Sequence, residues 1–133
     1  MSVHNIRRII PLTLSTALLC STLPASARDK PDDLVPAGKA VDCIQISTIR
    51  SSNVRDDRTI DFETNGGKVY RNTLPNSCPS LGFEKRFSYS TSIPQLCSVD
   101  IITVLQSGGP GLMRGASCGL GKFQPMQKGA KQD

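Results

Sequence analysis

The chain has 133 residues, a formal net charge of +5, a single histidine and no tryptophan. This length accommodates one domain of ordinary size. The charge is too modest to indicate a polyanionic partner, so nucleic acid is not expected as a ligand.

Residues 1–27 have the pattern of an export signal. Arg7 and Arg8 precede an apolar run from Ile9 to Leu23, and an Ala-x-Ala cleavage pattern ends at Ala27. The run contains a proline and falls short of the ~20 residues that span a bilayer. We therefore predict cleavage near Ala27 and an exported chain that is not transmembrane.

Cleavage removes His4 and Cys20, which leaves four cysteines and no histidine. A small exported domain has a limited core and gains from disulfides. Zinc is disfavoured because no C-x₂-C pair occurs and no histidine remains. Two disulfides are expected among Cys43, Cys78, Cys97 and Cys118. The pairing that we favour joins Cys43 to Cys118 and Cys78 to Cys97, although the sequence leaves all three pairings open.

The chain after the signal divides into a domain and two polar flanks. Residues 28–40 are predicted to form a flexible leader and residues 124–133 a flexible tail, because neither has a hydrophobic period. Residues 41–123 lack helical periodicity, while β-branched residues and turn signals recur every ~8–12 positions. The predicted fold is all-β, a small disulfide-stapled antiparallel barrel or sandwich.

The clearest local element is a hairpin around Asn65-Gly66-Gly67. Residues alternate on both sides of the turn, and a three-residue loop places Phe62 opposite Tyr70 and Asp61 opposite Arg71. A two-residue loop would set Arg71 against an apolar partner, so the longer loop is preferred.

Other strands are expected where apolar or alternating residues recur. They are residues 42–47, 49–54, 86–90, 98–105 and 116–123. Residues 98–105 are the most apolar and the best candidate for a central strand. Gln106–Gly115 is predicted to be a loose glycine-rich loop, and it lacks the Gly-Lys-Ser/Thr ending of a phosphate-binding loop.

Few acidic residues suggest chemistry. Asp61 and Glu63 share one strand face, which we expect to be a solvated surface with Arg71 as the partner of Asp61. Asp100 lies beside the apolar strand and, if buried, needs an arginine or backbone amides as partners. Serine nucleophiles lack a histidine to activate them. We therefore predict no catalytic residue, no cofactor and no metal.

Lys85 and Arg86 stand next to the aromatic residues Phe87 and Tyr89. Such interleaving is typical of single-strand nucleic-acid surfaces. In an exported domain of low charge we interpret the rings as core and the basic side chains as solvated neighbours. These four residues, together with Asp100, are kept as binding candidates, with an anionic envelope surface as the milder option.

The order of motifs resembles a known family. The motifs are Cys43-Ile, Asp57–Phe62, Tyr70–Leu74, Cys78-Pro-Ser-Leu, Phe87-Ser-Tyr, Leu96–Asp100 and Cys118-Gly-Leu-Gly-Lys-Phe. Over residues 42–125 they are similar to small secreted proteins of Gram-negative proteobacteria that form a domain of unknown function. The resemblance implies a periplasmic or secreted location. It carries over no site residue, since the family has no established activity.

These features predict a non-catalytic periplasmic or cell-envelope binding or structural module, whose partner is an unidentified protein or envelope component. The alternative is a periplasmic inhibitor of an envelope or foreign hydrolase that recognises its target through Gln106–Gly115. Small disulfide-bearing β-barrels that inhibit lysozyme are an architectural analogy for it. A hydrolase using Asp61, Glu63 or Asp100 is the third hypothesis. An exposed apolar patch would favour the first, a protruding rigid loop the second and a pocket with a perturbed carboxylate the third.

Overall fold

The computed structural model describes residues 33–129, which belong to one compact unit, and the predicted signal of residues 1–27 lies outside them. Strands dominate this part of the chain, with one 3-10 turn and one helical turn. The elements are β1 (Leu34–Pro36), β2 (Cys43–Gln45), η1 (Ile46–Thr48), β3 (Ile49–Val54), β4 (Thr59–Thr64), β5 (Val69–Thr73), α1 (Leu81–Glu84), β6 (Phe87–Tyr89), β7 (Gln95–Cys97), β8 (Ile101–Gly108), β9 (Gly111–Gly119) and β10 (Phe123–Lys128).

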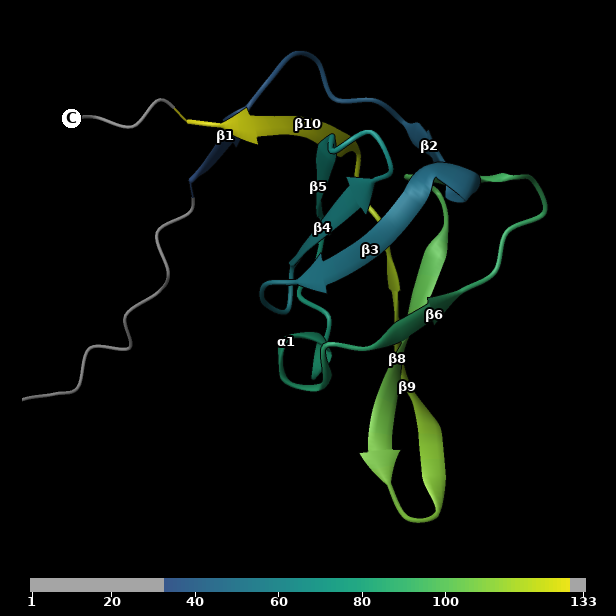
Figure 1. Cartoon of the computed structure of the whole chain (residues 1–133). Coiled ribbons are helices and arrows are strands. Elements are labelled where there is room, and N and C mark those ends of the chain that lie inside the picture. The colour runs from purple at the N-terminus through teal and green to yellow at the C-terminus, as the bar shows by residue number, and fades with distance from the viewer. Residues whose placement is uncertain (1–32, 130–133) are drawn as a thin grey trace, which may run out of the picture. The chain divides into compact units, whose positions relative to one another are not determined.

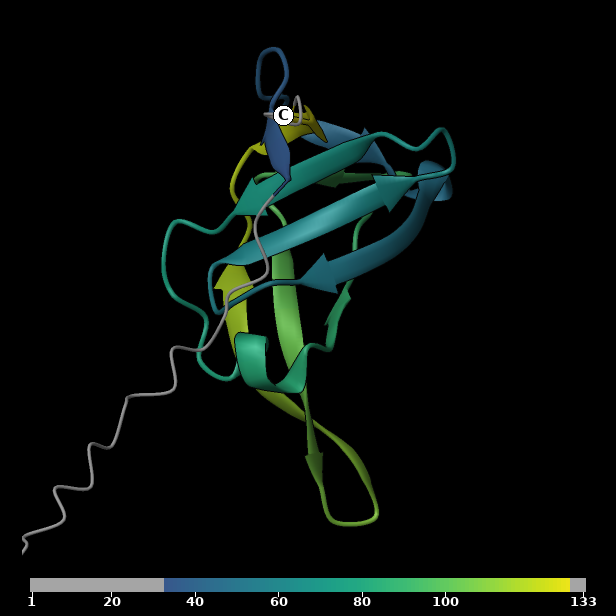
Figure 2. The ribbon, with the colours of Figure 1, turned by 60° about the vertical axis from the view of Figure 1, so that its left-hand side comes forward.

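The described strands form three antiparallel sheets. Five strands make the largest sheet in the order β1-β10-β5-β4-β3, three make a second in the order β6-β8-β9, and β2 pairs with β7. The strands of the two larger sheets cross one another (Figure 2). The all-β prediction is confirmed, and of the two predicted architectures the sheets resemble a sandwich, because they do not close into a barrel.

One hydrophobic core joins the sheets. Its fully buried members come from all three sheets, from α1 and from the loop after β5. They include Ile60, Phe62, Leu74, Leu81, Leu96, Ile102, Val104 and Phe123. Phe62 of β4 makes edge-on ring contacts with Phe87 of β6 and Phe123 of β10, at centroid distances of 6.2 and 5.6 Å. This ring therefore contacts both larger sheets.

The β4–β5 hairpin has the predicted register. Phe62 pairs with Tyr70 and Asp61 with Arg71. The loop has three residues, since the N–H of Thr64 donates to the carbonyl of Lys68 at 2.9 Å. Gly67 adopts a φ of +76°, which glycine reaches without steric cost. Loop length and alternation are both local features, and together they fix the pairing.

The predicted flexible leader and tail are wrong where they contain β1 and β10. These strands pair with each other, and β10 also pairs with β5, so it lies inside the large sheet (Figure 1). Phe123 and Met126 of β10 are buried although their neighbours are polar. Two core side chains and hydrogen bonds along both edges of β10 therefore order a segment whose composition suggests a tail.

The predicted central strand begins later than expected. Ser98 and Val99 lie in a turn, since the N–H of Asp100 donates to the carbonyl of Cys97 at 3.0 Å, and β8 starts at Ile101. β8 is central in its sheet, between β6 and β9. The prediction of a loose loop at Gln106–Gly115 is wrong, because β8 runs to Gly108 and β9 starts at Gly111.

The disulfides differ from the favoured pairing. Cys43 bonds to Cys97, its direct partner in the β2–β7 ladder, and Cys78 bonds to Cys118. The two Cα atoms are 4.0 Å apart in the first bond and 5.8 Å apart in the second. Two disulfides indicate an oxidising environment. The pairing depends on the long-range contact of β2 with β7, which no local sequence pattern reveals.

Replacing Cys78 and Cys118 together by alanine should lower the free energy of unfolding by about 2–4 kcal/mol. The bond joins residues with a sequence separation of 40 and so restricts the conformations of the unfolded chain. Urea denaturation monitored by circular dichroism measures the loss. A non-reducing peptide map of the unmodified protein provides the structural check, because it should contain a peptide in which Cys43 is joined to Cys97. An unchanged midpoint, or a peptide joining Cys43 to Cys118, would contradict this assignment.

Candidate functional site

The far part of the β8–β9 hairpin, residues 105–114, extends past α1 and is named the distal hairpin (Figures 1 and 2). Gly108 pairs with Gly111, so Gly109 and Pro110 form a two-residue turn. Gly109 has a φ of +69° and the proline ring holds a negative φ, the pattern of a type II′ turn. Such turns match the twist of antiparallel strands. The glycine-rich sequence therefore continues the hairpin.

Two apolar side chains are exposed on opposite faces of the distal hairpin. Leu112 pairs with Ser107 and Met113 with Gln106. Each apolar residue is 56% exposed. Because successive residues of a strand point to opposite faces, the two side chains lie on either side of the ribbon. A surface that buries both must contact the hairpin from two sides.

The distal hairpin is hydrogen-bonded to neighbouring elements at Ser107, the residue that pairs with Leu112 near the turn. Glu84 at the end of α1 accepts a hydrogen bond from the Ser107 N–H at 3.1 Å. The Arg86 guanidinium donates to the Ser107 hydroxyl at 2.8 Å. On the opposite strand, Arg114 is exposed and pairs with Leu105. These contacts hold the hairpin in place and leave two cationic groups beside its apolar residues.

The predicted basic and aromatic candidates occupy the start of this sheet. Lys85 and Arg86 are exposed, whereas Phe87 is half-buried and packs against the core. Tyr89 is partly exposed, with its ring 6.4 Å from that of Phe87. Phe87 therefore behaves as the core aromatic that the sequence indicates. Arg86 contacts the distal hairpin directly.

Sequence reasoning missed the exposed apolar side chains as a group. Phe83 of α1 is 87% exposed, and it precedes the Glu84 that bonds to β8. Leu112 and Met113 lie within the predicted loop Gln106–Gly115, and the sequence does not distinguish them from the rest of that loop. Apolar identity alone does not indicate whether a side chain is exposed, so no sequence signal separates these residues from core residues.

Asp100 has the backbone partner that its position predicts. Its carboxylate accepts a hydrogen bond from the Cys97 N–H at 2.7 Å, and its carbonyl accepts one from the Leu120 N–H at 3.0 Å. The residue thus fixes the turn between β7 and β8, next to a disulfide cysteine. These hydrogen bonds give Asp100 a structural role, which accounts for an acidic residue at this position.

Asp61 departs from the predicted solvated face. It is only 4% exposed, because β4 lies inside the sheet between β3 and β5. Two guanidinium groups lie against its carboxylate. The predicted ion pair with Arg71 is present at 2.7 Å, and Arg55 adds a second at 3.2 Å. Glu63 is half-buried and accepts a hydrogen bond from the Ser51 hydroxyl at 3.2 Å. Both carboxylates are therefore engaged within the fold.

The Asp56-Asp57-Arg58 segment connects β3 to β4. Asp56 accepts a hydrogen bond from the Arg58 N–H at 2.7 Å. Asp57 accepts one from the Gly82 N–H, also at 2.7 Å, and so attaches α1 to the end of β3. An added Cβ at Gly82 would lie about 3.0 Å from the backbone of Asp56 and Asp57, which explains the glycine.

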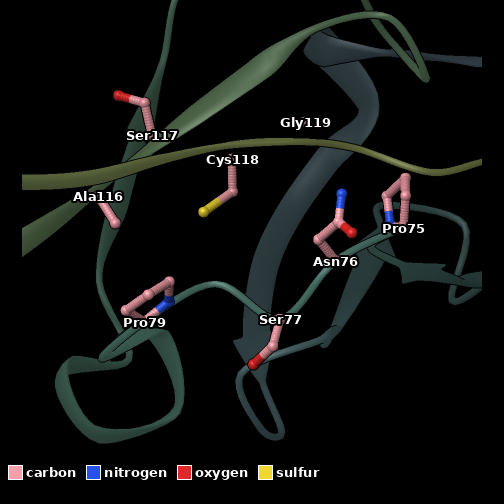
Figure 3. Close-up of a pocket in the computed structure, with 8 residues that line it drawn as sticks. All are labelled: Pro75, Asn76, Ser77, Pro79, Ala116, Ser117, Cys118 and Gly119. Atoms are coloured by element: carbon pink, nitrogen blue, oxygen red, sulfur yellow. The ribbon is translucent and has the colours of Figure 1, made fainter.

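A cavity of about 260 Å³ lies between β9 and the loop after β5 (Figure 3). Pro75, Asn76, Ser77 and Pro79 form one wall, and residues 116–119 form the other. The Cys78–Cys118 disulfide joins the two walls. The lining contains no charged side chain, and therefore supplies no acid or base.

A second cavity, of about 430 Å³, lies between β2, η1 and the β4–β5 turn. Gln45, Thr48, Asn65, Lys68 and Tyr70 are among its lining residues. Its single charged lining group is the ammonium of Lys68.

Comparison of the chain with protein-family models, with curated proteins and with solved structures finds no match. The resemblance to secreted proteobacterial proteins therefore stays a prediction. Within residues 33–129, no helix has the length and apolar character needed to cross a membrane.

Proposed function

We propose that the chain is a non-catalytic binding module of the periplasm or cell surface of a Gram-negative bacterium, and that it binds a partner protein through the distal hairpin. The observation that carries this proposal is the exposure of Leu112 and Met113 on opposite faces of a protruding hairpin. Burial of apolar surface contributes about 25 cal/mol per Å². A few side chains buried in well-packed pockets carry most of the binding free energy of a protein interface, and methionine and arginine are enriched there.

The charges beside the hairpin favour a partner with acidic groups on its surface. Arg86 and Arg114 are exposed next to it, and the carboxylate of Glu84 is engaged by the Ser107 N–H. Complementary potentials speed association and suppress wrong partners. The matching surface is therefore an apolar cleft with an acidic rim.

The carboxylates support a binding role over hydrolysis. Asp61, Glu63 and Asp100, the three acids that a hydrolase could use, each have a hydrogen-bond or ion-pair partner inside the fold. Their partners account for their positions.

A second candidate function is inhibition of an envelope or foreign hydrolase. It is favoured by the two-sided placement of Leu112 and Met113, because a partner that buries both must enclose the hairpin in a cleft. Substrate clefts of hydrolases are concave surfaces of this type. On this proposal the hairpin blocks access of the substrate.

Replacing Leu112 and Met113 together by serine should weaken binding of the partner at least 10-fold, because each truncated anchor costs more than about 1 kcal/mol. A photo-crosslinking residue at position 112 in the exported protein, with the same probe at Gln127 of β10 as control, identifies the partner. Binding is then measured with purified proteins by calorimetry. If the captured partner is a hydrolase, its activity is measured in the presence of an equimolar amount of this protein and should fall.

The matched control is Val99→Ser, which removes an apolar side chain that is 85% exposed in the turn before β8. Neither variant should change the free energy of unfolding by more than about 0.5 kcal/mol, since these side chains are exposed. Crosslinks at position 127 without crosslinks at 112, or equal loss of binding in Val99→Ser, would place the interface elsewhere.

A further inference from the structure

The 430 Å³ cavity between β2, η1 and the β4–β5 turn has covalent and hydrogen-bonded supports on two sides. The Cys43–Cys97 disulfide fixes β2 on one side. On the other side, the N–H of Asn65 donates to the carbonyl of Thr48 at 2.8 Å and attaches the turn to η1. The volume lies within the range of small-molecule sites, which are largely preformed.

The charge of the cavity favours an anion. Lys68 is its one charged lining residue, and this side chain takes part in none of the ion pairs found within residues 33–129. The two acids nearest to the lining in sequence are engaged elsewhere. Asp42 pairs with Lys122 at 3.2 Å, and Glu63 accepts from Ser51 on the opposite face of β4. An anionic group thus meets the ammonium without a competing carboxylate.

The hydrogen-bonding groups favour a ligand that also carries hydroxyl groups. The hydroxyl of Thr48 donates to the carbonyl of Gln45 at 2.8 Å, and that of Thr64 donates to the carbonyl of Lys68 at 3.1 Å. Since each proton is already used, both oxygens present lone pairs that accept from a ligand O–H. Phosphate is mainly an acceptor and does not match them. The amides of Gln45 and Asn65 can both donate and accept.

The cavity lining also includes apolar and aromatic side chains. Ile44 is buried, and Tyr70 is half-buried with its ring packed against the core. A lining that combines an aromatic ring with polar groups suits a ligand with one apolar face and many hydroxyl groups. We propose that this cavity binds a carboxylate-bearing sugar, with the carboxylate at Lys68 and the ring over Tyr70. The site is separate from the distal hairpin and does not depend on the function proposed for it.

The test is a titration of the ¹⁵N-labelled protein with glucuronic acid and, in parallel, with glucose, which lacks the carboxylate. The amide resonances of Gln45, Asn65 and Lys68 should shift saturably with glucuronic acid, and the Kd for glucose should be at least about 10-fold higher. An oligomer of glucuronic acid that binds more tightly than the monomer identifies a glycan as the source. Equal affinity per site identifies the free sugar.

Two variants make the outcome specific. Lys68→Met should raise the Kd for glucuronic acid about 10-fold or more, whereas Lys128→Met, at the end of β10, should leave it unchanged. An unchanged Kd for glucuronic acid in Lys68→Met would overturn the proposal. It would equally be overturned by glucose binding as tightly as glucuronic acid, by inorganic phosphate binding there as tightly, or by no shift with either sugar.

Discussion

Phe62→Ala is expected to lower the free energy of unfolding by about 3–5 kcal/mol. Phe62 is fully buried in β4, and its ring contacts Phe87 of the three-stranded sheet and Phe123 of the large sheet. Removing the ring opens a cavity where the two sheets meet, and the loss of packing adds to the loss of buried apolar area. Urea denaturation followed by circular dichroism measures the change.

The control for Phe62 is Phe83→Ala, which removes the same side chain from an exposed position in α1. It should change the free energy of unfolding by no more than about 0.5 kcal/mol. If Phe62→Ala does not fold, Phe62→Leu gives a smaller measurable loss of roughly 1 kcal/mol. Equal effects of the two alanine variants would mean that Phe62 does not form the centre of the core.

The part of the fold that the sequence predicts is the part set by near neighbours. In the β4–β5 hairpin, the three-residue loop and the alternation of apolar residues determine which residues oppose each other. The ion pair of Asp61 with Arg71 follows from the same register. The burial of Asp61 does not follow, because it depends on Arg55 and on the position of β4 inside the sheet.

The features that the sequence does not predict depend on contacts between distant segments. Cys43 and Cys97 are separated by 54 residues, and their pairing requires β2 to lie beside β7. β1 and β10 lie in segments that are polar in composition. β1 pairs with β10, and β10 pairs with both β1 and β5. A local window contains neither partner, so composition indicates flexible ends.

In the candidate site, too, some features follow from neighbouring residues and others from contacts between distant segments. The glycines of Gln106–Gly115 predict a loop in this segment, and the type II′ turn explains the glycine at position 109. That Leu112 and Met113 remain exposed depends on the hairpin extending beyond the core, which is a property of the whole sheet. The proposed sugar site also requires three separate segments to meet around Lys68.

The second large effect is expected at Asn72, a polar residue with no exposed surface in the middle of β5. Its side-chain amide donates to the Gly121 carbonyl at 2.6 Å, and its side-chain oxygen accepts from the Gly121 N–H at 2.8 Å. This double hydrogen bond attaches the β9–β10 connection to the large sheet. Any Cβ at position 121 would lie directly against the carbonyl oxygen of Thr73, so the close approach requires glycine.

Asn72→Ala should lower the free energy of unfolding by about 2–4 kcal/mol, because two backbone groups of Gly121 lose their partners at about 1–3 kcal/mol each. Asn72→Leu separates hydrogen bonding from packing, since leucine fills the space but pairs with neither group. We expect it to be destabilising as well, whereas Asn76→Ala, in the exposed loop after β5, should have little effect. Full stability of Asn72→Leu in urea denaturation would show that volume alone holds this connection. A large loss in both Asn72 variants would show that the fold depends on a buried amide between residues 49 positions apart.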